Sequence, residues 1–223
     1  MCCGFTAEAL KATNLSPHFM KNIYTALAIL AISLNAANGQ TAPAVKVDGG
    51  KLSIESQKTP MFQANGIKDK RWSPKDWMEI DFSFQIKLPS SAGGRKGSLD
   101  TMTVNYYIAL NAQNKEGKFE VLKGTFNYVD IPAAEDCHAL VYVSPATLRR
   151  FLLKDGFTSS DVKAWGYEVI VEGQRIEGNS SLGKNPWWEK ADGFSFSDGV
   201  MLAKTETPFS ILWGDYDVSA KKQ

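Results

Sequence analysis

The chain has 223 residues and carries 25 basic against 24 acidic side chains, a formal net charge of +1 at pH 7. This balance excludes the strongly basic classes of protein, so we expect neither nucleic-acid binding nor a polybasic membrane patch. Beyond the N-terminal region the one remaining cysteine is Cys137. The sequence therefore predicts no internal disulfide and a core that holds the fold alone, with Cys137 as a small buried hydrophobe.

The first predicted element is an export signal. An apolar, uncharged run at 23–34 follows Met20 and a lysine, and small residues follow the run. The run is shorter than the roughly 20 residues that span a bilayer. The pattern predicts a signal peptide cleaved after Gly39, with Gln40 as the first mature residue and no stable membrane span. A buried helix and an uncleaved membrane anchor are the alternatives.

Residues 1–39 are therefore expected to be a signal peptide preceded by an over-extended N-terminus. The basic start of a signal peptide normally lies close to the first residue, which favours Met20 over Met1 as the true start. Cys2 and Cys3 precede the apolar run, whereas the cysteine of a lipoprotein follows it, so no lipid anchor is expected. The mature protein should be periplasmic, outer-membrane-associated or extracellular.

The mature chain predicts a series of β-strands. The clearest is 77–88, where apolar residues alternate with polar ones as in an antiparallel sheet with one solvated face. In 165–171 the side chains of Trp165, Tyr167 and Val169 fall on one side, which predicts the central strand of an all-β domain. The other expected strands are 45–47, 52–54, 101–111, 118–131, 138–143, 175–177, 194–202 and 207–213.

One short helix is predicted between two of these strands. Ser144 is a suitable N-cap and Pro145 fits the first helical position. Apolar residues then recur at helical spacing as far as Asp155, and a glycine follows. Farther along, Pro208 makes the last strand an edge strand at best. We expect one domain over 40–218 and a disordered tail at 219–223.

These elements predict an immunoglobulin-like antiparallel β-sandwich with one short helix. A jelly roll or another sandwich topology is the alternative, because the chain lacks the cysteine pair of antibody domains. Tyr167 stands near the start of a late strand, at a position similar to the tyrosine corner of such domains.

A second resemblance rests on the signal peptide at Met20 and the run Gln40–Lys51. The chain resembles small exported proteins encoded beside type IV pilus-like genes in mucus-dwelling gut bacteria. That resemblance implies an immunoglobulin-like fold, a place at the cell surface or in the periplasm, and a role in pilus assembly or host contact.

No catalytic residue, metal site or cofactor is predicted. His138 is the one histidine after the signal peptide, and it adjoins Cys137. Adjacent strand residues point to opposite faces, so these two side chains should not share a site. One histidine and one cysteine are also too few to hold a metal. The sequence lacks a nucleophile elbow and a phosphate-binding glycine loop. We therefore expect a protein that is not an enzyme.

The candidate ligand-binding residues are Trp187, Trp188 and Glu189. Two adjacent tryptophans with a carboxylate could stack on sugar rings and accept hydroxyl hydrogen bonds. Alternatively, the tryptophans close one end of the sandwich, since large aromatics dominate core burial. The sequence thus favours a non-catalytic interaction or structural protein of the cell envelope, associated with pili, whose partner is an envelope or pilus protein. The alternative is a glycan-binding module, for example for a host glycan. Exposed tryptophans would favour the glycan-binding module, and buried tryptophans the envelope protein.

Overall fold

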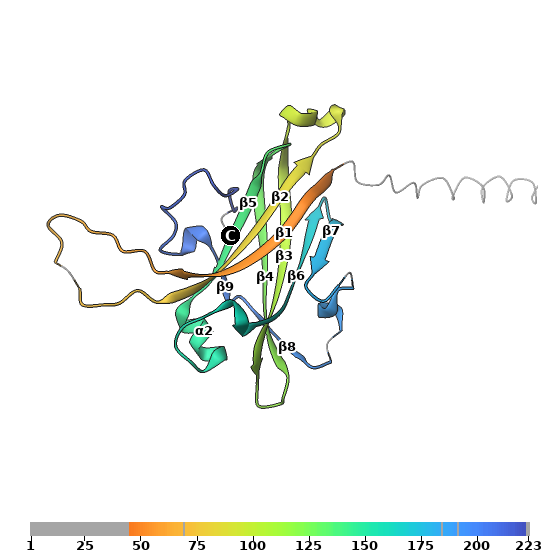
Figure 1. Ribbon diagram of the computed structural model, residues 1–223. Coiled ribbons are helices and arrows are strands. Elements are labelled where there is room, and N and C mark those ends of the chain that lie inside the picture. The colour runs from red at the N-terminus through yellow and green to blue at the C-terminus, as the bar shows by residue number, and fades with distance from the viewer. Residues whose placement is uncertain (1–44, 69, 184, 191, 222–223) are drawn as a thin grey trace, which may run out of the picture. The chain divides into compact units, whose positions relative to one another are not determined.

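The computed structural model describes residues 45–68, 70–183, 185–190 and 192–221, so the predicted signal peptide lies outside the described residues. The described residues form two β-sheets packed as a sandwich (Figure 1). Within these ranges no helix is long and apolar enough to cross a membrane. The strands are β1 (Lys46–Lys58), β2 (Asp76–Lys87), β3 (Ser98–Gln113), β4 (Phe119–Pro132), β5 (Cys137–Val143), β6 (Val162–Val171), β7 (Gln174–Ser180), β8 (Phe194–Asp198) and β9 (Met201–Ala203).

The strand order confirms an immunoglobulin-like sandwich. One sheet has the order β1-β2-β5-β9 and the other has the order β7-β6-β3-β4-β8. In immunoglobulin terms β1, β2 and β5 take the places of strands A, B and E, and β7, β6 and β3 those of G, F and C. Strand β9 occupies the place of D although it comes much later in the chain. The pairs are antiparallel except β4 with β8, which is parallel. The middle strand of the larger sheet is β3, and the predicted central strand β6 lies beside it.

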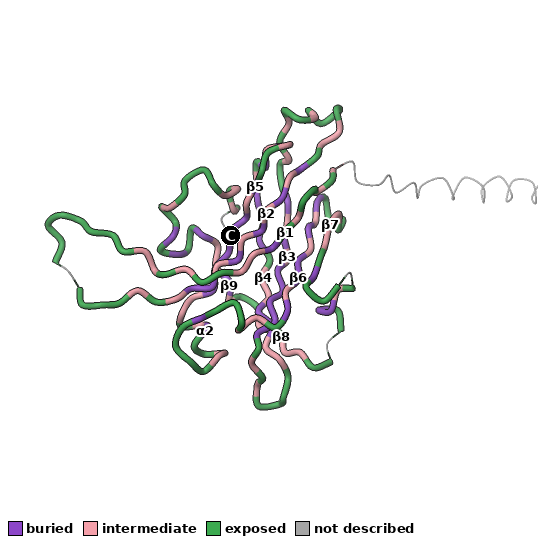
Figure 2. The backbone as a smooth tube through the Cα atoms, in the orientation of Figure 1, coloured by how far each residue is buried: buried purple, intermediate pink, exposed green. Residues whose placement is uncertain are grey.

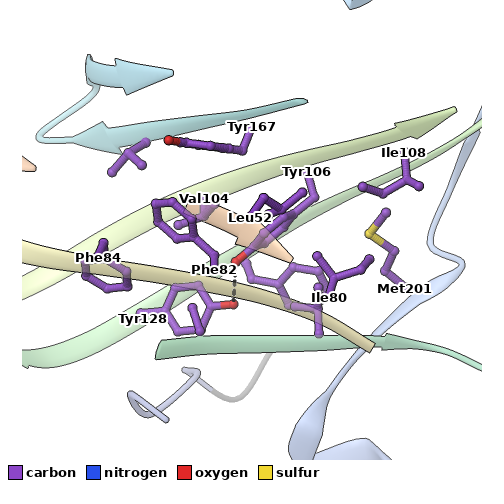
Figure 3. Packing of buried hydrophobic residues seen from close by; sticks show 14 of the residues in the cluster. Leu52, Ile80, Phe82, Phe84, Val104, Tyr106, Ile108, Tyr128, Tyr167 and Met201 are labelled. Atoms are coloured by element: carbon purple, nitrogen blue, oxygen red, sulfur yellow. Dashed lines mark hydrogen bonds between the residues drawn. The ribbon is translucent and has the colours of Figure 1, made fainter. Parts of the chain in front are cut away.

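The core lies between the inner faces of the two sheets. The predicted alternation in β2 is confirmed, because its even-numbered apolar side chains are all buried. Figure 3 shows Phe82 of β2 beside Tyr167 of β6, with ring centroids 4.5 Å apart. Tyr106 and Tyr128 share a hydrogen bond of 3.3 Å between their hydroxyls, which satisfies two polar groups inside the core.

Tyr167 does not form a tyrosine corner. Its hydroxyl donates a 3.0 Å hydrogen bond to the carbonyl of Gly50, in β1 of the opposite sheet. Gly50 lies where the β1–β2 register shifts between Asp48 and Lys51, so the two strand pieces expected in this region are one bulged strand. A Cβ at Gly50 would lie 2.6 Å from the Tyr167 hydroxyl oxygen, so the contact that joins the sheets requires glycine here.

The predicted helix is confirmed as α2 (Pro145–Leu152). The Ser144 side chain accepts a 3.2 Å hydrogen bond from the backbone N–H of Thr147, which satisfies one of the free donors at the helix start. The helix ends earlier than Asp155, because Leu153 takes a left-handed conformation with φ 55°. Since α2 connects β5 to β6, it carries the chain from one sheet to the other.

The strand predictions fail in the C-terminal part. The segment 194–202 is two strands, because a turn at Gly199 (φ 70°) sends β8 and β9 to different sheets. The segment 207–213 is a series of turns and forms no edge strand. Pro208 lacks a backbone N–H, and Ser210 donates its own N–H back to the Thr207 carbonyl at 3.2 Å.

Residues 218–221 are hydrogen-bonded to the sandwich. The N–H of Val218 donates to His138 of β5 at 2.8 Å, and that of Val129 in β4 donates to Ser219 at 3.0 Å. Lys221 donates to the Asn127 carbonyl of β4 at 2.7 Å. Ser219 and Lys221 thus have backbone partners on β4, and Val218 has one on β5. These contacts, with β8 and β9, cover the β4 and β5 edges on one side of the sandwich.

Candidate functional site

The predicted ligand-binding tryptophans are buried. They lie in a single helical turn, η5 (Trp187–Glu189), and their side chains are 7% and 8% exposed. The Trp188 ring stacks on Tyr107 of β3, with centroids 4.7 Å apart and an interplanar angle of 6°. Trp187 packs against Phe194 at 4.9 Å. Both rings cover the outer face of the larger sheet, so they do not present a flat surface on which a sugar could stack.

Glu189, the third predicted residue, is exposed, and its carboxylate lies 3.8 Å from the Arg175 guanidinium. Arg175 also makes a closer ion pair of 3.0 Å with Glu168. Trp187 donates its Nε1–H to the Trp165 carbonyl at 3.3 Å. The buried Nε1–H of Trp188 has no hydrogen-bond partner among the described residues. The structure brings the three predicted residues together in one turn, but the two tryptophan side chains are buried against the larger sheet.

Cys137 and His138 lie on opposite faces of β5, as predicted. Cys137 is buried in the core, and burial raises the pKa of its thiol to about 11. His138 faces outward and donates from Nδ1 to Asp81 at 2.9 Å. Its ring stacks on Tyr216, with centroids 4.1 Å apart. No group of three His, Cys, Asp or Glu side chains in the described part of the chain could hold a metal ion.

A polar cleft of about 240 Å³ lies on the outer face of the sheet β1-β2-β5-β9. Its carboxylates are Glu79 and Asp81, which are two residues apart on β2 and so share this face. Tyr142 donates to Glu79 at 2.7 Å, and Tyr216 donates to Asp81 at 2.8 Å. Burial raises the pKa of Glu79 above its usual value. Sequence reasoning missed this group because Tyr216 reaches β2 from far along the chain.

The cleft is closed on one side by the segment 204–218, which is held by a buried ion pair. Lys204 pairs with Asp217 and also donates to the Trp213 carbonyl at 3.4 Å. Trp213, whose carbonyl accepts this hydrogen bond, has a positive φ of 51°. Because Tyr216 donates to Asp81 of β2, the arrangement anchors the segment 204–218 to the sheet.

The β1–β2 loop, residues 59–75, projects from the sandwich in Figure 1. Four large apolar side chains are exposed on it: Met61 (70%), Phe62 (55%), Ile67 (72%) and Trp72 (52%). Figure 2 shows that the loop is exposed along most of its length. A glycine and several charged residues stand among these apolar side chains in the sequence, so composition alone does not reveal the apolar group.

The base of the β1–β2 loop is fixed to the sandwich. Thr59 and Lys75 are joined by a backbone hydrogen bond of 2.9 Å. The buried Trp77 donates its Nε1–H to the Thr59 hydroxyl at 3.0 Å, and Lys58 pairs with Asp76 at 2.6 Å. The loop is therefore held at its two ends, while its four large apolar side chains are exposed.

Comparisons with known proteins agree with the fold. No curated protein matches the chain. A crystal structure of a protein from Akkermansia muciniphila is similar, with a TM-score of 0.69 and 25% sequence identity. The match covers 80% of this chain and 94% of that one. A protein-family model matches residues 38–223, and the chain therefore belongs to the family that this model describes.

Proposed function

We propose that the protein is a non-catalytic, exported component of the cell envelope that acts by contacting another envelope component. Pilus association is the setting that its resemblance to pilus-linked exported proteins implies. The observation that carries the proposal is the β1–β2 loop, where four large apolar side chains are exposed on a projecting segment. Exposed apolar side chains gathered in one place are typical of an interaction surface.

Contact through this loop is better supported than pairing along a sheet edge. The outer edges of β1 and β7 are unpaired within the described strands. Both strands are irregular, however: β1 shifts register between Asp48 and Lys51, and β7 skips Ile176 between its pairs with Val169 and Ile170. Such bulges twist an edge away from an incoming strand.

The non-catalytic part of the proposal is supported by the contacts of the titratable groups. The outward-facing His138 is engaged with Asp81 and stacked on Tyr216. The Cys137 thiol has its pKa raised by burial, which opposes formation of a nucleophilic thiolate. The alternative, glycan binding through Trp187 and Trp188, loses its main support because neither ring is exposed.

Co-sedimentation with envelopes from the source organism tests the proposal. The exported form should bind, and the double variant Phe62→Ser/Trp72→Ser should lose most of that binding because it removes two of the exposed apolar groups. Leu153→Ser/Leu182→Ser is the matched control, since both leucines are exposed elsewhere on the surface. Equal binding by the loop variant and the wild type would refute the assignment of the loop. Intact-mass measurement of the exported form should show Gln40 as its first residue.

A further inference from the structure

The β1–β2 loop places basic side chains among its apolar ones. Lys68 follows Ile67 directly, and Lys70 and Arg71 lead into Trp72. All of these side chains are exposed. In the sequence of residues 59–75 the one acidic residue is Asp69, so the loop is net positive although the whole chain is close to neutral. The overall charge balance therefore conceals a local basic and apolar segment.

This concentration of large apolar groups distinguishes the loop from the rest of the described surface. Leu153 and Leu182 lie singly on separate loops, and the exposed Trp213 and Tyr216 of the segment 204–218, near Ile211, stack on other rings of the protein. Single exposed apolar residues are normal for a soluble domain and need no partner. Met61, Phe62, Ile67 and Trp72 lie within one loop, beyond its fixed base, and all four are exposed.

The mixture of residue types indicates the chemistry of the partner. Protein–protein interfaces are enriched in arginine but depleted of lysine. Here Lys68 and Lys70 stand within four residues of Trp72, so a dry protein pocket around the tryptophan would have to desolvate lysine ammonium groups. At a membrane surface, by contrast, Trp lies at headgroup level and Lys and Arg reach anionic phosphates while their stems contact apolar groups.

We propose that the β1–β2 loop docks the protein on a phospholipid membrane that contains anionic lipids. This inference rests on the proposed function and names the envelope component that the loop contacts. Phe62, Ile67 and Trp72 enter the boundary between headgroups and acyl chains, and Lys68, Lys70 and Arg71 bind lipid phosphates. The base of the loop, fixed by the Thr59–Lys75 hydrogen bond, transmits this attachment to the sandwich. The binding is peripheral and reversible, because a single loop cannot span the bilayer.

Co-sedimentation of the exported form with lipid vesicles tests the inference. Vesicles of phosphatidylcholine with phosphatidylglycerol should bind the protein, and vesicles of phosphatidylcholine alone should bind it much more weakly. Binding should fall as salt rises, because salt screens attraction to a charged surface. Lys70→Gln/Arg71→Gln should weaken partitioning roughly 30-fold, at about 1 kcal/mol for each basic residue near the surface.

Two further pairs of variants complete the test. Phe62→Ser/Trp72→Ser should abolish stable binding, and the tryptophan emission of the wild type should shift to the blue on adding vesicles. Lys115→Gln/Lys190→Gln removes two exposed lysines elsewhere and should leave binding nearly unchanged. If wild type and the loop variants partition alike, or if the control lysines matter as much as Lys70 and Arg71, the inference is wrong.

The experiment also separates this inference from the proposed function. If vesicles of both compositions fail to bind, while native envelopes still bind in a loop-dependent way that protease treatment of the envelopes removes, the partner is a protein. That result overturns membrane docking and leaves the proposed function standing. If neither vesicles nor envelopes bind through the β1–β2 loop, both proposals fall.

Discussion

Gly166 and Trp188 provide the sharpest test of the packing described above. A Cβ built on Gly166 would lie 1.9 Å from Cζ3 of Trp188, and two more ring atoms would lie 2.5 and 2.7 Å away. The ring cannot retreat freely, because it is stacked on Tyr107 with centroids 4.7 Å apart. Gly166→Ala must therefore push the Trp188 ring outward by more than an ångström and expose part of its buried surface.

The cost follows from these distances. Overpacking a well-filled site costs about 1 to 3 kcal/mol, and losing a buried Trp side chain altogether costs about 3 to 5 kcal/mol. We expect Gly166→Ala to lower the free energy of unfolding by about 2 to 4 kcal/mol. Gly214→Ala is the control, because nothing lies within 4 Å of a Cβ at that position. It should change stability by about 0.5 kcal/mol at most.

A double-mutant cycle identifies the cause. Trp188→Ala alone should cost about 3 to 5 kcal/mol. Adding Gly166→Ala to it should cost little more, because the ring that blocks the new methyl group is gone. The two changes should thus be coupled by about 2 kcal/mol or more, as expected for residues in contact. Urea unfolding followed by far-ultraviolet circular dichroism measures all four proteins. Additive costs, or a harmless Gly166→Ala, would refute the reasoning.

Three other predictions concern single groups. Burial raises the pKa of Glu79 above its usual value, so the folded state binds this proton more tightly than the unfolded chain and the stability contribution of Glu79 falls as pH rises through the folded pKa. As pH rises from mildly acidic to neutral, the melting temperature of Glu79→Gln should therefore fall less than that of the wild type. A larger fall in the variant would contradict this. The buried Cys137 thiol, with a pKa of about 11, should resist iodoacetamide at neutral pH until the protein is unfolded, as mass spectrometry can show; rapid labelling of the native protein would contradict the core position. Tyr167→Phe leaves the Gly50 carbonyl without its donor and should cost about 1 to 3 kcal/mol in urea unfolding, whereas an unchanged midpoint would mean that the inter-sheet hydrogen bond contributes nothing.

The sequence predicted those parts of the fold that depend on local burial. The alternation in β2 reports directly which side chains face the core, and the Ser144–Pro145 pair marks a helix start through local hydrogen bonding and backbone geometry. The same logic placed Cys137 and His138 on opposite faces of one strand. In each case the signal and the structure lie within a few residues of each other.

The features that sequence reasoning missed depend on contacts between distant segments. Tyr167 was assigned to a corner, but its partner Gly50 lies 117 residues away. An adjacent pair of tryptophans has the same pattern whether it is exposed or buried. Trp188 can pack on the sheet because Gly166 of β6 has no side chain beneath the ring. This contact cannot be inferred before the position of β6 in the sheet is known.

Two candidate sites were hidden for a similar reason. The cleft carboxylates Glu79 and Asp81 look like ordinary outward-facing residues of a solvated strand until the segment 204–218 covers them. In the β1–β2 loop, charged residues stand beside large apolar ones, so the overall composition of the loop does not reveal the apolar group. Composition averages over a segment, whereas exposure belongs to each residue separately.

The covering of the β4 and β5 edges by late segments has a consequence for how the chain reaches its fold. A chain ordered only as far as β7 would still have open hydrogen-bonding groups on β4 and β5, the positions later taken by β8, β9 and residues 218–221. Long-range pairing of this kind slows folding, and open strand edges recruit other chains. Removing residues 218–221 should thus leave much of the core intact but raise the tendency of folding intermediates to aggregate, so that yield falls more than stability.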